Sequence, residues 1–187
     1  SPGYMVDDLK ETDPIRQDLS FFEENFDGLM PLEVTVDFGK PKQVLNLPNL
    51  QKLDKLSEEL SKDEDISKPI SLIEVIKFAN QAFYNGKPSY YKLPTNMTKN
   101  FILKYASQST GEIGGQANSF VDSTLQRVRL SFRVKDIGTK KMQEKENKLY
   151  NIVEQYFPND RYTVKVTGSS IIFFKGTQYL VFNLFTS

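Results

Sequence analysis

The side chains of this chain that are capable of chemistry are carboxylates, amines and phenols, because the sequence contains neither cysteine nor histidine. Without these two residue types the chain cannot assemble a Ser-His-Asp or Cys-His arrangement or a zinc site with cysteine ligands. Carboxylates are plentiful, but none has metal-loop spacing, and the adjacent Glu23 and Glu24 point in different directions on a helix. We therefore predict a protein that is not an enzyme, with no catalytic residue, metal or cofactor. A carboxylate-dependent hydrolase is the alternative within the enzyme class.

Aromatic side chains are concentrated in a turn-rich stretch, residues 83–105, which is broken by Pro88 and Pro94. Tyrosine joins an apolar ring to a polar tip, and short, proline-broken elements bury their side chains less completely than a sheet core does. Such a surface suits an amphiphilic ligand or a protein partner, and the alternative is ordinary packing onto the core. We expect at least two of its four tyrosines, Tyr84, Tyr90, Tyr91 and Tyr105, to be partly exposed and to border a groove between this stretch and the sheet. The candidate substrate-lining residues are Phe83, Tyr84, Tyr90, Tyr91, Phe101 and Tyr105.

Charge and pattern argue against a nucleic-acid partner. The chain has 24 basic and 24 acidic residues, so it lacks the overall positive charge that is typical of nucleic-acid-binding proteins. Its most basic segment, RVRLSFRVK at 127–135, turns arginine, serine and lysine outward and presents no aromatic ring on which a base could stack. The glycine-rich TGEIGG at 110–115 lacks the Lys-Ser or Lys-Thr that completes a phosphate-binding loop.

The elements that must position these residues are read from the spacing of apolar side chains. Three segments alternate apolar and polar residues, as half-buried strands do: LEVTVDF at 32–38, RVRLSFRVK at 127–135, and RYTVKVTG at 161–168. Helical spacing marks residues 47–65, 71–86 and 138–160, and ISKPISL at 66–72 reads as a short extended piece that Pro69 limits to a strand end or an edge.

The order of these elements is that of the ferredoxin-like fold, a split β-α-β arrangement with the first and third strands side by side at the centre. The expected class is α+β: residues 31–72 and 125–168 form one sheet with two helices on one face, and residues 73–124 are a helical insertion. Opposite charges on neighbouring strands stabilise a sheet by about 0.2–1 kcal/mol per pair. The expected cross-strand partners are Glu33 and Asp37 with Arg129 and Arg133.

The 187 residues are expected to form a single domain. Residues 1–30 are predicted to contain a leading helix, and residues 169–187 an amphipathic segment. No stretch reaches the roughly 18 to 20 uninterrupted apolar residues that a membrane span requires.

Several segments together resemble the RND superfamily of membrane exporters, in particular its MMPL-like, Patched-related branch. These segments are LSFFEENFDGLMPLEVTVDFGK, SLIEVIKFANQAFYNGKPSYYKLP, FRVKDIGT and VTGSS, and they follow one another along most of the chain. The resemblance implies an extracytoplasmic porter domain with a ferredoxin-like core, and the FFEENF helix favours the loop of the transporter's second half.

The resemblance also implies a function and a location. The domain would be periplasmic, part of an exporter in the bacterial inner membrane, and would contribute to the passage or binding of hydrophobic or amphiphilic, lipid-like substrates. Its partners would be the rest of the same transporter and those substrates, and the full-length protein is a possible homo-oligomer. Residues 169–187 would lead to a further membrane helix, so the C-terminal end would be a cut, and proton-coupling residues would lie in the membrane helices. The alternative is a free-standing ferredoxin-like ligand-binding or regulatory module.

Overall fold

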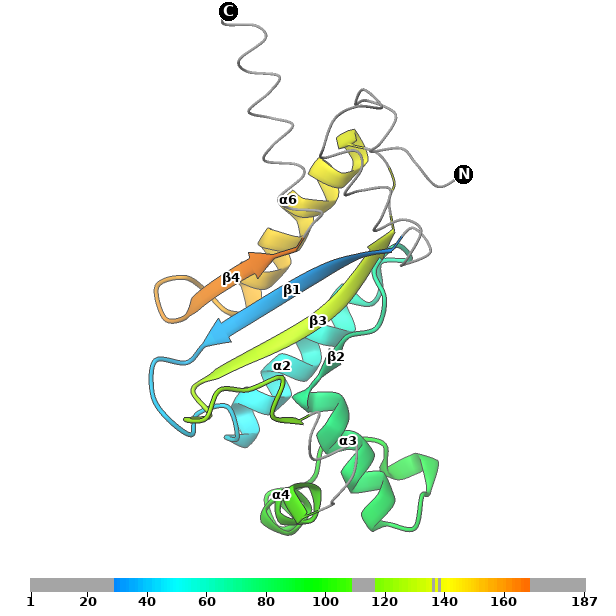
Figure 1. The fold of residues 1–187 in the computed structure, drawn as a ribbon, viewed down its shortest axis with the longest axis vertical. Helices are drawn as coiled ribbons and strands as arrows, with labels where there is room; N and C mark the ends of the chain where they lie inside the picture. Colours follow the sequence, from blue (N-terminus) through cyan, green and yellow to red (C-terminus); the bar gives the residue numbers. More distant parts are fainter. Residues whose placement is uncertain (1–28, 109–116, 136, 138, 169–187) are drawn as a thin grey trace, which may run out of the picture.

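A computed structural model describes residues 29–108, 117–135, 137 and 139–168 of the chain. In these residues a four-stranded antiparallel sheet packs against helices, so the domain is α+β, and the sheet is open rather than closed into a barrel (Figure 1). The strands are β1 (Leu29–Asp37), β2 (Ile70–Ser71), β3 (Arg127–Lys135) and β4 (Thr163–Thr167), in the spatial order β2-β3-β1-β4. The helices are α2 (Leu47–Leu60), α3 (Leu72–Phe83), α4 (Lys99–Gln108) and α6 (Thr139–Tyr156), with a 3-10 turn, η1 (Pro88–Tyr90).

β1 and β3 form the centre of the sheet. Their antiparallel register runs from Leu29 opposite Lys135 to Asp37 opposite Arg127, which confirms the prediction that these two strands are neighbours. Alternation turns the apolar side chains of both strands to the same face, where Val34 and Leu130 lie opposite each other with no exposed surface.

The helices α2 and α6 cover this apolar face, on the far side of the sheet in the view of Figure 1. α2 has a proline in its first turn, where the missing N–H costs nothing, and its leucines recur every three or four residues. One continuous core results from strands and helices together. Its helical members include Leu50, Leu53, Leu56 and Leu60 of α2, and Met142, Leu149 and Val153 of α6.

The open face of the sheet carries ion pairs between its central strands. Arg129 Nη1 lies 3.3 Å from Glu33 Oε1, as the sequence predicted, and Arg127 Nε lies 2.7 Å from Asp37 Oδ2. The prediction that Arg133 would also pair with these acidic residues was wrong. The register places Arg133 opposite Pro31, whereas Asp37 lies at the other end of β1, opposite Arg127.

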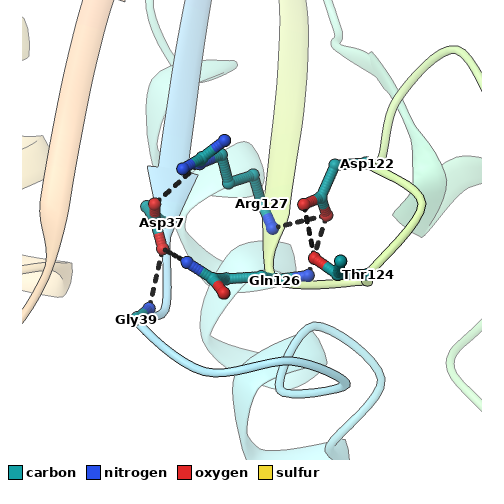
Figure 2. A network of polar contacts seen from close by, with 6 residues as sticks. All are labelled: Asp37, Gly39, Asp122, Thr124, Gln126 and Arg127. Atoms are coloured by element: carbon teal, nitrogen blue, oxygen red, sulfur yellow. Dashed lines mark hydrogen bonds and ion pairs between the residues drawn. The ribbon is translucent and has the colours of Figure 1, made fainter.

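Asp37 also belongs to the network that fixes the loop before β3 (Figure 2). Its carboxylate accepts hydrogen bonds from the Gly39 backbone N–H (2.7 Å) and from Gln126 Nε2 (2.9 Å) as well as from Arg127. Beside it, the Asp122 carboxylate accepts from the backbone N–H groups of Gln126 (2.8 Å) and Arg127 (2.9 Å). These carboxylates satisfy backbone donors at the point where β3 enters the sheet, so their role is structural.

Between β2 and β3 the chain forms α3, η1 and α4, which project from one end of the sheet (Figure 1). We call the segment from α3 through α4, including η1 and the connecting loops, the helical insertion. The predicted leading helix and the predicted amphipathic segment at 169–187 lie outside the described residues, except that Leu29 and Met30 belong to β1. Among the described residues, no helix is both long and apolar enough to cross a membrane.

Candidate functional site

The aromatic side chains that the sequence singled out meet where α3 ends and η1 begins. Phe83 is the last residue of α3, Tyr84 follows it, and Tyr90 closes η1. The rings of Tyr84 and Tyr90 stack with centroids 4.0 Å apart and an angle of 16° between their planes. Phe83 meets Tyr84 edge to face, with centroids 5.3 Å apart. We call Phe83, Tyr84 and Tyr90 the aromatic cluster.

A tight reversal of the backbone brings these rings together. Asn85 and Gly86 both adopt positive φ angles, of 58° and 74°, which turn the chain sharply after Tyr84. Side chains of α3 then hold the returning segment: Gln81 Nε2 donates to the Gly86 carbonyl (3.0 Å), and the buried Asn80 donates from Nδ2 to the Tyr90 carbonyl (2.8 Å). The aromatic cluster is therefore positioned by hydrogen bonds within the insertion.

Tyr91 contacts charged side chains of α3. Its hydroxyl donates a hydrogen bond to the Glu74 carboxylate. Partial burial of the phenol, this hydrogen bond and the nearby negative charges of Glu74 and Asp54 all raise the pKa of Tyr91 above its ordinary value, so the ring stays neutral. A neutral phenol is an apolar surface with one hydrogen-bonding tip, and it is not an anionic nucleophile.

Lys77 ties the insertion to the core. Although lysine is seldom buried, Lys77 is, and its Nζ lies 2.5 Å from Asp54 Oδ1 on α2 and 3.8 Å from Glu74 Oε1. The amine also lies 5.9 Å from the centre of the Tyr91 ring. A buried amine between two carboxylates is a structural ion pair, and it fixes α3 and η1 relative to α2.

The six predicted lining residues differ in exposure. Tyr84 and Tyr90 are half-buried, and Phe83 and Tyr91 are exposed by 45% and 44%. Phe101, on α4, is 67% exposed, and Tyr105 also lies on α4 but its side chain is outside the described residues. The lining role of these residues stays a prediction.

The expected groove between insertion and sheet also stays a prediction. Two grooves in the described part of the structure lie elsewhere, one between α2 and α6, and one between α6 and β4.

Sequence reasoning missed two exposed apolar side chains of the insertion. Phe78 is 47% exposed and Met97 is 87% exposed. Phe78 falls outside the helical spacing of the buried residues Leu72, Val75 and Ala79, and this departure was the available signal. Met97 lies in an irregular segment, where side-chain direction has no periodicity to reveal it.

The remaining strongly interacting charges have structural roles. Lys145 of α6 pairs with Asp63 and Asp65, its Nζ lying 2.9 Å from Asp65 Oδ2. Burial alone would lower the pKa of the Lys145 amine, but the hydrogen bonds to Asp63 and Asp65 outweigh it and raise that pKa. No group of three or more acidic residues that could hold a metal ion occurs within 29–108, 117–135, 137 and 139–168.

Comparison with known proteins adds no family assignment, since neither a protein-family model nor a curated protein sequence matches the chain.

Proposed function

We propose that this chain is the periplasmic porter domain of an RND-type membrane exporter, with a ferredoxin-like split β-α-β core and a helical insertion. The order β2-β3-β1-β4, with α2 and α6 on one face, is the topology that such a core requires. Placement of the insertion between β2 and β3 agrees with the expected arrangement of residues 73–124. The domain acts by binding and guiding substrates rather than by catalysis.

The observation that carries the proposal is the exposed aromatic surface of the insertion. Large apolar side chains that stay exposed on one segment favour binding of a ligand or of another protein there. The exposed large apolar side chains of the insertion are Phe78, Phe83, Tyr91, Met97 and Phe101. The hydrogen bonds of Asn80 and Gln81 hold the aromatic cluster in one conformation. A pre-positioned surface loses little conformational entropy on binding.

The chemistry of this surface suits an amphiphile. The apolar rings of Phe83, Tyr84 and Tyr90 would contact an acyl chain or another hydrophobic group, and Lys92, whose Nζ lies 5.4 Å from the Tyr90 ring centre, offers a positive charge beside it. An anionic or polar head group would bind near this amine while the apolar part covers the rings. The substrate class is therefore lipid-like, and the other partner is the rest of the transporter in the bacterial inner membrane.

The experiment measures binding of a dansyl-labelled fatty acid to the 187-residue chain. Replacing Tyr84 and Tyr90 together by alanine should weaken binding by about 5- to 30-fold, since two ring contacts are lost. Tyr150→Ala is the matched control, because Tyr150 is an exposed tyrosine on α6, away from the insertion, and its loss should change binding less than twofold.

The same substitutions distinguish a lining role from packing in the full-length transporter. Lost export at normal abundance supports the proposal, whereas lost abundance shows that the tyrosines only hold the insertion in place. A parent reading frame without membrane helices on either side would contradict the transporter and favour the free-standing ligand-binding module.

A further inference from the structure

The outer edge of β4 has no strand partner among the described residues. β4 pairs with β1 on one side only and lies at the end of the sheet (Figure 1). In the described part of the chain, no backbone hydrogen bond outside the sheet involves residues 163–167. An antiparallel edge strand directs the N–H and C=O groups of alternate residues outward, where another extended chain can pair with them.

A groove runs beside this edge, between β4 and α6. Its apolar lining residues are Val164 and Val166 from β4 and Val153 from α6. The groove has a volume of about 280 Å³, and its other lining residues are Tyr150, Asn151, Glu154 and Asn159. Because side chains alternate along a strand, a chain added beside β4 would place every second side chain in this groove.

Lys165 lies on the other face of the strand and is exposed. Its neighbour across the sheet is the uncharged Thr35 of β1, and none of the ion pairs within the described residues involves Lys165. A strand added on the outer side would place one of its own residues directly opposite this amine. An acidic residue there is favourable and a basic one is unfavourable.

The sequence of β4 distinguishes a foreign strand from a second copy of this chain. β4 reads Thr-Val-Lys-Val-Thr, which is the same in both directions. Antiparallel pairing of two copies centred on this strand would match threonine with threonine and valine with valine, but it would set Lys165 against Lys165. Lysine at an edge is also a common means by which proteins prevent self-association.

We infer that the β4 edge binds an extended segment of a partner polypeptide by strand addition, with an acidic residue opposite Lys165 and apolar β-branched residues on either side. The backbone pairing supplies affinity, the groove over Val164 and Val166 selects the flanking apolar residues, and Lys165 selects the acidic one. This interaction is separate from the insertion and does not depend on the proposed export function.

The test uses two synthetic peptides and the 187-residue chain. One peptide is Ser-Thr-Val-Glu-Val-Thr-Ser, and the other has lysine in place of the glutamate. The chain should bind the glutamate peptide about 2- to 30-fold more tightly than the lysine peptide, because an opposite pair gains and a like pair loses similar free energies. Lys165→Glu should reverse this preference. Fluorescence anisotropy of labelled peptides gives both dissociation constants.

Two further variants locate the interaction. Lys68→Glu makes the same change of charge at an exposed lysine near the opposite edge of the sheet, next to β2, and should leave the preference unchanged. Asn151→Trp fills the groove from the exposed side of α6 and should weaken binding of the glutamate peptide at least fivefold. Equal binding of both peptides, binding of neither at millimolar concentration, or no reversal by Lys165→Glu would overturn the inference.

Discussion

Phe132 is the largest completely buried side chain of the central strands, and it lies opposite Leu32 in the pairing of β3 with β1. Truncation of a buried phenylalanine removes its transfer free energy and leaves a cavity that the tightly packed core fills only in part. We expect Phe132→Ala to lower the free energy of unfolding by about 3–5 kcal/mol, as measured by urea denaturation. Phe101→Ala, at an exposed position, is the control and should cost less than about 1 kcal/mol. An unchanged stability in the Phe132 variant would contradict the assigned face of β3.

Asp37 makes the stability of the fold depend on pH. The hydrogen bond from Arg127 lowers the pKa of Asp37 below its ordinary value of 3.8, and the donors Gly39 and Gln126 add to this against the opposing effect of burial. The folded state therefore binds the proton less tightly than the unfolded state does. The resulting stabilisation is present above pH 3.8 and is lost as the pH falls through the lower folded-state pKa.

We expect Asp37→Asn to flatten the acid limb of the stability curve. Denaturation at a series of pH values from about 7 to about 2.5 should show a smaller loss of stability in the variant than in the wild type. Asp160→Asn, an exposed aspartate in the loop between α6 and β4, is the control and should retain the wild-type slope. Parallel curves for the wild type and Asp37→Asn would show that the network in Figure 2 does not persist in solution.

At the scale of elements, the end of β4 depends on a glycine. Gly168 has a φ of +151°, and a Cβ atom at this position would lie 2.2 Å from the Pro31 carbonyl oxygen of β1. We expect Gly168→Ala to cost more than about 2 kcal/mol, because both backbone strain and a clash with a fixed main-chain atom oppose it. Gly39→Ala isolates the strain: its φ is +74° but its Cβ would meet open space, so it should cost only about 1 kcal/mol. Thermal unfolding of both variants gives the comparison, and equal losses would exclude the clash.

The elements differ in how well the sequence predicts them. β1 and β3 are predictable because strict alternation leaves only one way to bury Val34 and Leu130. β2 shrinks to two residues because Pro69 cannot donate to the ladder. α3 is predictable as a helix, but it ends at Phe83 rather than at residue 86.

The candidate site is less predictable than the fold for a physical reason. The stacking of Tyr84 on Tyr90 depends on the positive φ angles of Asn85 and Gly86 and on side-chain hydrogen bonds across the turn. The burial of Lys77 depends on Asp54, which is more than twenty positions earlier in the chain. The spacing of apolar residues shows which face of a helix or strand is buried. It contains no signal for polar contacts between residues that are far apart in the sequence.

At the scale of the whole molecule, the described residues contain two hydrophobic clusters of unequal size. The main core joins the sheet, α2, α6 and the inner face of α3, including Ile76. The second cluster is a pair, Ala79 of α3 and Ile102 of α4, through which α4 packs on α3, and α4 also meets the main core through the half-buried Leu103. Few buried contacts hold α4, so it should open without unfolding of the sheet.

We therefore expect Ile102→Ala to act on α4 alone. Loss of this buried side chain should lower the free energy of opening of the α4 amides by about 2–5 kcal/mol. Where the wild-type opening free energy is smaller than this, protection of the α4 amides should be lost altogether. The β3 amides should be unaffected. Ile76→Ala is the matched control, because Ile76 is an equally buried isoleucine of the insertion that belongs to the main core, so it should lower protection in β3 and α4 together. Native-state hydrogen exchange followed by mass spectrometry of peptides from the two elements separates these cases. If the α4 amides of the wild type exchange only with global unfolding, at the same free energy as β3, the molecule is one cooperative unit and the insertion is as rigid as the sheet that carries it.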